Sequence, residues 1–284
     1  MSEIKLVVCD LDGTLLNDEK MITPYTVSVM KKVREMGIAV CLASGRDEQM
    51  MSIYEKQLGG CEYMLSDNGA LVRSGKRVIC CNFLAEEDTA SLLAYLNEQQ
   101  MTFMMYSAEQ MYFSEGSEKL KKRIRDYEAL SQKAGCPVKL KVREFLRSGS
   151  VLGYKTAAKI VAYEENETAM EAYISFVDSL ANVHHEPTGY GLLGAFQSQV
   201  SKKTALETIM QEMKIGKENV CVFGDYENDL SMFACADYRI CMENGVKALK
   251  DAASSVTFSN NDDGVARYLE KELGIVTKQR LYEL

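Results

Sequence analysis

IKLVVCDLDGTLL, at residues 4–16, is the stretch of sequence that decides the fold. Its first part, residues 4–9, is an apolar run with the length and composition of a buried strand. Two carboxylates follow directly, Asp10 and Asp12, with one residue between them. They could face one site together, where they could bind a cation or divide nucleophilic and acid/base roles. The alternative is a strand followed by a capped turn, because Asp and Gly are common turn residues.

Short apolar strands alternate with helices in both outer parts of the chain. Residues 24–36 have the apolar spacing of a helix, with Thr23 as its N-cap and Pro24 at its first position. Apolar runs at 38–42, 63–65, 220–223, 238–241 and 256–258 read as strands. This alternation predicts βαβ units, and therefore an α/β fold with a doubly wound parallel-sheet core.

The middle of the chain has a different pattern. Long helices are expected at about 85–99 and 115–134, together with strands of mixed polarity at 103–106, 110–113 and 158–162. This combination predicts an α+β domain inserted into the core. We therefore expect the core at residues 1–82 and 193–284, and the inserted domain at residues 83–192.

Composition argues against several classes of protein. The 284 residues are 46% hydrophobic and 26% charged, with a formal net charge of −8. No Lys/Arg block is dense enough for a nucleic-acid-binding surface, and no apolar stretch reaches the roughly 20 residues that span a bilayer. The first residues lack a signal-peptide layout, so a cytoplasmic location is the default expectation. The nine cysteines include no C-x-x-C pair, which favours reduced thiols in the core.

Two further loops carry polar side chains where predicted strands end. Residues 224–229 read GDYEND, so Asp225 follows a buried strand and Asp229 lies four positions later. The alternative for this loop is acidic N-capping of an ordinary helix. Ser44 and Gly45 follow another strand, where a hydroxyl and free amides could cradle a phosphate, although these residues taken alone favour a plain turn. Open α/β sheets bind ligands at the edge formed by the carboxyl ends of their strands. All three loops would lie close together at that edge.

An acidic protein that binds an anion must supply positive charge locally. Lys202 lies just before a predicted helix and could supply it, although most lysines are solvated surface residues. Two or three aspartates would bind Mg²⁺ through oxygen and leave room for a substrate phosphate. The metal, a lysine and main-chain amides would then offset the charge on a transferring phosphoryl group.

Taken in order, these residues resemble a known set of motifs. The chain is similar to the haloacid-dehalogenase superfamily at that family's four motifs. In chain order these correspond to residues 10–16, residues 44–46, Lys202 and residues 224–229. Within it they resemble the Cof-type phosphatases, which carry a large α/β cap between the second and third motifs. Residues 66–70 and 261–266 also resemble that subgroup. The similarity spans residues 4–78 and 199–273, and the cap region matches in size and position more than in residues.

The resemblance implies a mechanism. Asp10 would attack phosphorus to form an aspartyl-phosphate, and Asp12 would protonate the leaving oxygen and then activate water. Mg²⁺ would be held by the Asp10 carboxylate, the Asp12 main-chain carbonyl and Asp225, with Asp229 supporting the site. The residues implied to bind the phosphate are Asp10, Leu11, Ser44, Gly45, Lys202 and Asn228.

Two positions depart from the family's pattern. Ser44 stands where threonine is usual, which keeps the hydroxyl. Lys203 follows Lys202 where glycine is common, and the register to residues 204–206 favours Lys202 as the motif lysine. The sequence leaves open whether four other residues contact substrate, namely Arg46, Asn68, His184 and His185.

The predicted function is Mg²⁺-dependent hydrolysis of a small phosphorylated metabolite, such as a sugar phosphate or a cofactor phosphate. One alternative is a phosphomutase or phosphotransferase acting on a hexose phosphate. A second alternative is a non-catalytic, phosphate-binding regulatory protein. No nucleic-acid or membrane partner is expected, and the sequence does not indicate an oligomeric state.

Overall fold

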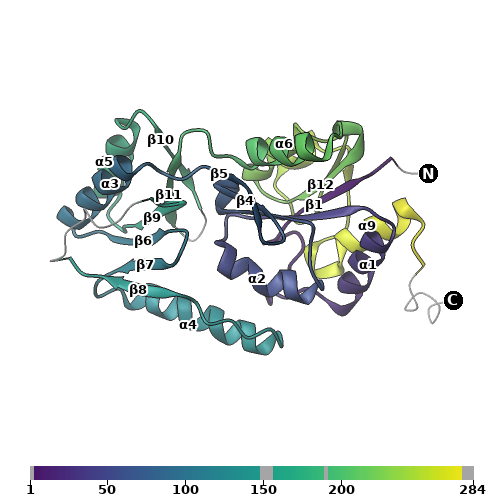
Figure 1. Ribbon diagram of the computed structural model, residues 1–284, viewed down its shortest axis with the longest axis horizontal. Helices are drawn as coiled ribbons and strands as arrows, with labels where there is room; N and C mark the ends of the chain where they lie inside the picture. Colours follow the sequence, from purple (N-terminus) through teal and green to yellow (C-terminus); the bar gives the residue numbers. More distant parts are fainter. Residues whose placement is uncertain (1–2, 148–155, 189–190, 277–284) are drawn as a thin grey trace. The chain divides into compact units, whose positions relative to one another are not determined.

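The first strand and the helix after it form where the sequence predicts them. The computed structural model describes residues 3–147, 156–188 and 191–276 (Figure 1). Strand β1 (Leu6–Asp10) is buried along its whole length. Helix α1 (Pro24–Glu35) is capped by Thr23, whose side chain accepts a hydrogen bond from the Thr26 amide. The chain divides into two compact units: residues 1–80 with 201–284, called the core unit below, and residues 81–200, called the inserted unit.

An eight-stranded sheet forms the centre of the core unit, in the order β14-β13-β12-β1-β2-β3-β4-β5. The six strands from β14 to β3 run parallel, and β4 is antiparallel to β3. The bounds are β2 Ala39–Ala43, β3 Tyr63–Ser66, β4 Leu71–Ser74, β5 Arg77–Cys81, β12 Val220–Gly224, β13 Tyr238–Cys241 and β14 Ser255–Val256. The strands β1 to β5 follow one another toward one side of the sheet, and β12 to β14 follow one another toward the other side. The direction in which strands are added therefore reverses between the neighbours β1 and β12.

Helices cover both faces of this sheet. α6 (Lys202–Met213), α7 (Leu230–Phe233) and α8 (Lys247–Ala252) share one apolar core with inward-facing strand residues such as Val8 and Val222. α1 packs against α9 (Gly264–Leu273), and Figure 1 shows this pair on the side of the sheet opposite α6. α2 (Glu48–Gln57) connects β2 to β3. This arrangement confirms the predicted doubly wound α/β core.

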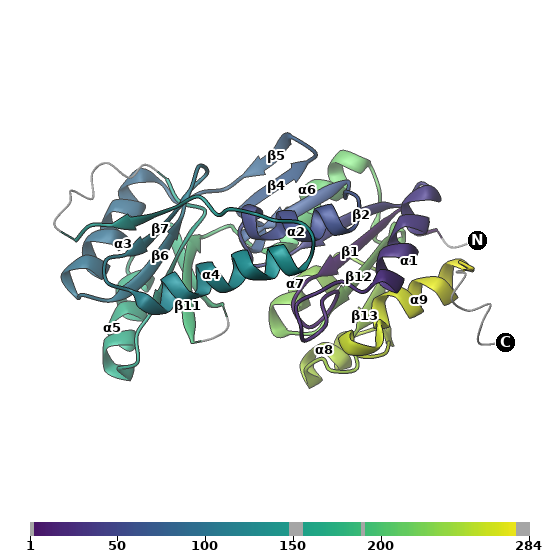
Figure 2. The same ribbon diagram turned by 90° about the horizontal axis from the view of Figure 1, so that it is seen from below.

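The inserted unit has its own sheet and its own core. Its six strands have the order β10-β11-β9-β6-β7-β8, with antiparallel neighbours except for the parallel pair β7 and β8. The strand bounds are β6 Thr102–Tyr106, β7 Met111–Ser114, β8 Val142–Phe145, β9 Lys159–Tyr163, β10 Val183–Pro187 and β11 Leu192–Gln197. α3 (Glu86–Glu98) and α5 (Glu167–Asp178) pack on one face of the sheet, and Figures 1 and 2 show α4 (Glu118–Lys133) on the other. This is the α+β arrangement that the sequence predicts.

The boundaries of the inserted unit differ from the predicted range of 83–192. The unit spans residues 81–200. The larger difference arises at β11, which pairs antiparallel with both β9 and β10. Because the strand partners of β11 all belong to the inserted unit, the chain returns to the core unit only at Ser201.

The prediction of thiols in the core holds for part of the cysteines, whereas Cys81 is exposed. All nine lie in the described ranges and carry free thiols, and five of them are buried, including Cys9 in β1 and Cys221 in β12. Within those ranges, no helix combines the length and the apolar character needed to cross a membrane.

Candidate active site

Three loops of the core unit meet because parallel neighbouring strands end at the same edge of the sheet. Asp10 is the last residue of β1 and lies beside Ala43 at the end of β2. On its other side, β1 pairs with β12, which ends at Gly224 directly before Asp225. The reversal of strand order between β1 and β12 marks this edge as the place where open α/β sheets bind ligands.

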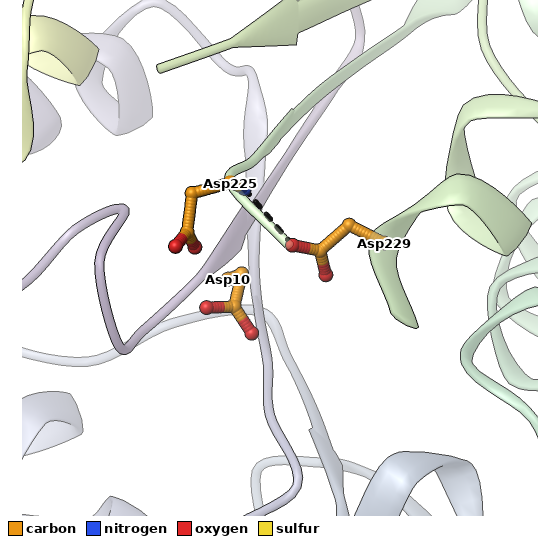
Figure 3. Close-up of side chains that lie close together, drawn as sticks. All are labelled: Asp10, Asp225 and Asp229. Atoms are coloured by element: carbon orange, nitrogen blue, oxygen red, sulfur yellow. Dashed lines mark hydrogen bonds between the residues drawn. The ribbon is translucent and has the colours of Figure 1, made fainter. Parts of the chain in front are cut away.

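Three aspartates form a cluster at this edge. Oxygen atoms of Asp10, Asp225 and Asp229 all lie within 4.8 Å of one another (Figure 3). Asp10 and Asp229 are buried, and Asp225 is partly exposed. Grouped carboxylate oxygens are the ligands that Mg²⁺ and Ca²⁺ prefer, so the cluster could hold a divalent metal ion.

Lys202 joins two members of the cluster. Its Nζ donates to Asp10 Oδ1 at 2.6 Å and to Asp229 Oδ1 at 2.8 Å. Asp229 Oδ2 accepts from the main-chain amides of Asp225 (3.0 Å) and Tyr226 (3.2 Å), so both of its oxygens are already bonded. Lys202 is only 2% exposed, which makes this a buried ion-pair network at the start of α6.

Burial and mutual repulsion perturb the charges of this cluster. Burial raises the pKa of Asp10 well above its usual value; Lys202 opposes this effect, and Asp229 and Asp225 reinforce it. Burial, followed by the nearby Asp229, raises the pKa of Asp225 to about 6. Burial alone would lower the pKa of Lys202, but the carboxylates of Asp10 and Asp229 raise it. Three carboxylates facing one lysine leave excess negative charge, which a bound cation would relieve.

The Asp12 carboxylate lies outside this cluster. It accepts a two-point hydrogen bond from Arg46, with Nε at 2.6 Å from Oδ2 and Nη2 at 2.7 Å from Oδ1. Lys20 Nζ lies 2.9 Å from Oδ1. Burial alone would raise the pKa of Asp12, but Arg46 and Lys20 hold it well below its usual value. Arg46, whose contact with substrate the sequence left open, therefore forms an ion pair with Asp12.

The turn after Asp12 is packed against Asp225. Thr14 Oγ1 donates to Asp225 Oδ1 at 2.9 Å. Gly13 has a left-handed φ of +82°, and a Cβ at this position would collide with the Asp225 carboxylate. Thr14 belongs to the motif quoted from the sequence, but its contact with Asp225 was not predicted, because the two residues lie 211 positions apart.

The remaining predicted residues lie at the same edge with different contacts. Ser44 is buried, its amide donates to Leu65 O (2.9 Å), and its Oγ accepts from the Arg46 amide (3.2 Å). Asn68 borders Gly45 so closely that a Cβ on the glycine would lie 3.0 Å from Asn68 Oδ1. The sequence left open whether Arg46 and Asn68 contact substrate. Both lie beside the predicted motifs in the structure.

Leu11 and Asn228 flank the acidic cluster in the sequence. Leu11 is fully buried, and its carbonyl accepts from the amides of Thr14 and Leu16 in the turn after β1. Asn228 is exposed and precedes Asp229 in a short 3-10 turn (Glu227–Asp229). Their roles in phosphate binding stay predictions.

The two histidines belong to β10 of the inserted unit. His184 Nδ1 lies 3.1 Å from Gln197 O, and its ring stacks on Phe196 at 5.7 Å. His185 Nε2 lies 3.3 Å from Asp178 Oδ1. Each therefore has a protein partner within the inserted unit.

Comparison with known proteins identifies the family. The sequence model of a family described as haloacid dehalogenase-like hydrolase matches residues 7–269. The chain belongs to the haloacid dehalogenase-like hydrolases. This confirms the family predicted from the motifs, and it extends the similarity through the inserted unit.

Relatives of this hydrolase match along nearly its whole length. The 5-amino-6-(5-phospho-D-ribitylamino)uracil phosphatase YitU of Bacillus subtilis is 27% identical over 94% of this chain and 96% of its own. A haloacid dehalogenase-like hydrolase from Bacteroides thetaiotaomicron has a similar structure (TM-score 0.82, 24% identity, 95% and 99% of the chains). The subclass IIB sugar phosphatase BT4131 shares the fold as well (TM-score 0.77, 19% identity, 96% and 100%). The family and its named phosphatases agree with the predicted class of enzyme, a phosphoric monoester hydrolase.

Proposed function

We propose that this hydrolase is a Mg²⁺-dependent phosphatase that acts on small phosphorylated metabolites through an aspartyl-phosphate on Asp10. The observation that carries the proposal is the buried cluster in which Lys202 bridges Asp10 and Asp229 beside Asp225. A nucleophilic carboxylate, a divalent-metal ligand set and a fixed positive charge stand together there, as phosphoryl transfer to a carboxylate requires.

The metal would be held by the carboxylates of Asp10 and Asp225 and by the main-chain carbonyl of Asp12. Asp229 would support the site, because its hydrogen bonds from Lys202 and from the Asp225 amide hold those neighbours in place. Bound Mg²⁺ would supply the positive charge that lets an anionic nucleophile approach an anionic phosphate.

The substrate phosphate would be bound by groups at the ends of β1, β2 and β12 and at the start of α6. Hydroxyl and amide donors placed at such strand ends offset the negative charge that is shared among phosphoryl oxygens. The proposed binding residues are Asp10, Leu11, Ser44, Gly45, Lys202 and Asn228.

Catalysis would proceed in two steps on this chain's own side chains. An oxygen of Asp10 attacks phosphorus while Asp12 donates a proton to the leaving-group oxygen. Asp12 then takes a proton from water, which attacks the phosphorus of the aspartyl-phosphate and restores Asp10. The inserted unit would act as a cap that excludes bulk water and selects the leaving group.

The substrate class we propose is a sugar phosphate or a cofactor phosphate. Support comes from the relative that is named for a phosphoribitylamino-uracil substrate and matches 94% of this chain. A panel of phosphorylated metabolites that includes this compound and hexose phosphates would identify the preferred substrate.

The direct test is Mg²⁺-dependent release of phosphate from an aryl phosphate, with Asp10→Asn as the control. Activity no greater than that of folded Asp10→Asn would contradict the proposal and favour a non-catalytic, phosphate-binding protein. Product analysis with a hexose phosphate distinguishes a phosphomutase, which would return the phosphoryl group to the sugar rather than to water.

A further inference from the structure

A tight turn at residues 17–21 brings a second cation to Asp12. The Lys20 amide donates to Asn17 O at 2.8 Å, and the Asn17 amide donates to Met21 O at 3.1 Å. The Asn17 side chain closes the turn, because its Oδ1 accepts from the Met21 amide at 3.0 Å. This turn places Lys20 Nζ 2.9 Å from Asp12 Oδ1.

The backbone of Lys20 is in a conformation that glycine or asparagine would adopt more readily. Its φ is +60°, in the left-handed region that lysine rarely occupies. The strain of such residues is tolerated where the surrounding structure imposes it, and it is concentrated at functional sites. Glycine could adopt this backbone conformation without strain, so the lysine side chain can be removed without disturbing the turn.

Two asparagines from the far end of the chain anchor the turn. Asn261 forms a reciprocal pair with Asp18: its Oδ1 accepts from the Asp18 amide, and its Nδ2 donates to Asp18 Oδ2, both at 2.9 Å. Asn260 Nδ2 donates to Leu16 O at 2.9 Å. These contacts span more than 240 positions of sequence and fix the turn on the core unit.

A third asparagine extends the anchor to the residue after Asp12. Asn244 Nδ2 donates to Gly13 O at 2.8 Å, and its Oδ1 accepts from the Asn260 amide at 2.9 Å. The segment from Gly13 to Asp18 is thus held at both ends, which fixes Lys20 relative to Asp12.

Lys20 and Arg46 bind the Asp12 carboxylate unequally. Among the residues that the structure describes, Oδ1 accepts from both cations, and Oδ2 accepts from Arg46. A carboxylate has roughly four acceptor positions, two on each oxygen. Oδ1 is therefore fully used, and the remaining position is on Oδ2.

We propose that Lys20 is a positioning residue, which with Arg46 fixes the Asp12 carboxylate so that Oδ2, the oxygen with an open acceptor position, faces the leaving group. Asn260 and Asn261 act with it by holding the turn from which Lys20 reaches Asp12. The inference rests on the proposed acid/base role of Asp12. Without Lys20, the carboxylate would keep its two-point contact with Arg46 but lose the contact that ties it to the turn, so the carboxylate and the guanidinium could shift together.

The test is the leaving-group dependence of Lys20→Gly. Glycine tolerates a φ of +60°, so this variant removes the side chain without adding backbone strain. Phenyl phosphate and 4-nitrophenyl phosphate have similar shapes, but phenolate needs protonation more than nitrophenolate does. We expect kcat/KM, which reports the steps up to departure of the leaving group, to fall roughly tenfold on phenyl phosphate, a fraction of what general acid catalysis supplies, with little loss on 4-nitrophenyl phosphate.

Gln100→Gly is the matched control, because Gln100 of the inserted unit has a similar φ of +55°. This variant should keep the wild-type ratio of the two rates, and Lys20→Arg should restore most of that ratio. Asn261→Ala should change the ratio in the same direction as Lys20→Gly. Asn166→Ala, which removes the N-cap of α5, should not change it.

An unchanged ratio in Lys20→Gly, or an equal loss on both esters, would overturn the inference while the proposed function stands. A wild-type enzyme that hydrolyses neither ester in the presence of Mg²⁺ would contradict the proposed function and this inference together.

Discussion

Lys202 Nζ lies 2.6 Å from Asp10 Oδ1, although 192 positions separate the two residues in sequence. Both side chains are buried, and the same Nζ also bonds Asp229. The protein carries a formal net charge of −8, so it must supply positive charge locally wherever it binds an anion. The start of α6 supplies that charge at the carboxyl end of β1.

Lys202→Met should destabilise the protein and abolish most activity. Removing one partner of a buried ion pair leaves the carboxylates of Asp10 and Asp229 uncompensated, at an expected cost of about 3 kcal/mol in the free energy of unfolding. We also expect kcat to fall about a hundredfold, the effect of losing one fixed electrostatic group. Urea denaturation and steady-state kinetics measure the two effects.

Lys203→Met is the matched control, because Lys203 is exposed and pairs only loosely with Glu207 across one helical turn. Its effect on the free energy of unfolding should stay within about 0.5 kcal/mol. Equal losses in the two variants would show that the family's motif lysine had been assigned to the wrong position.

Gly13→Ala should weaken metal binding specifically. The added Cβ would collide with the Asp225 carboxylate, which must then leave its present position. We expect the Mg²⁺ concentration for half-maximal activity to rise about tenfold, as happens when the partners that orient metal ligands are disturbed. Gly37→Ala introduces nearly the same backbone strain, at a φ of +80° but into open space, and should leave the Mg²⁺ requirement unchanged.

Stabilisation by Mg²⁺ should grow as the pH rises. In the metal-free protein, burial and Asp229 raise the pKa of Asp225 to about 6, above its ordinary value. The charged carboxylate therefore destabilises the fold above pH 6, and this penalty is relieved as the pH falls through 6 and a proton binds. Mg²⁺ binds the charged form, so the rise in Tm on adding Mg²⁺ should be larger at pH 7.5 than at pH 5.

The control for this pH dependence is Asp251→Asn, which changes an exposed carboxylate paired with Lys247. It should show the wild-type trend, whereas Asp225→Asn should lose most of the Mg²⁺ effect at both pH values. A Mg²⁺-induced shift in Tm that is the same at pH 5 and pH 7.5 would argue against Asp225 as a ligand.

Asp12→Asn should separate the two chemical steps. An asparagine cannot donate the proton to the leaving group or take one from water, so formation of the phosphoenzyme should be slow and its hydrolysis poor. Rapid quenching should detect phosphoenzyme that persists longer than in the wild type. A variant that turns over at the wild-type rate would exclude Asp12 as the acid/base.

The ends of the strands could be predicted from the sequence. β1, β2 and β12 are apolar runs that stop at polar residues, and parallel strands necessarily end at one edge of the sheet. That geometry is sufficient to bring Asp10, Ser44 and Asp225 together. The family match over residues 7–269 then confirmed the fold that these runs predict.

The contacts that hold these residues could not be predicted in the same way. Lys20 reaches Asp12 through a left-handed turn, and Asn244, Asn260 and Asn261 bond backbone groups more than 230 positions away. No periodic pattern marks such residues. The end of the inserted unit was also misplaced, because an apolar run such as β11 does not reveal which sheet it joins.

Trapping the phosphoenzyme tests the central proposal most directly. Wild type, Asp10→Asn and Asp12→Asn would each be mixed with ³²P-labelled substrate and Mg²⁺, quenched in acid, and reduced with borohydride, which converts an acyl phosphate of aspartate to homoserine. The account predicts protein-bound label before the reduction, and homoserine at residue 10 after it, in wild type and Asp12→Asn, and neither in Asp10→Asn. Turnover by the wild type with label at another residue, or undiminished turnover by Asp10→Asn, would contradict it.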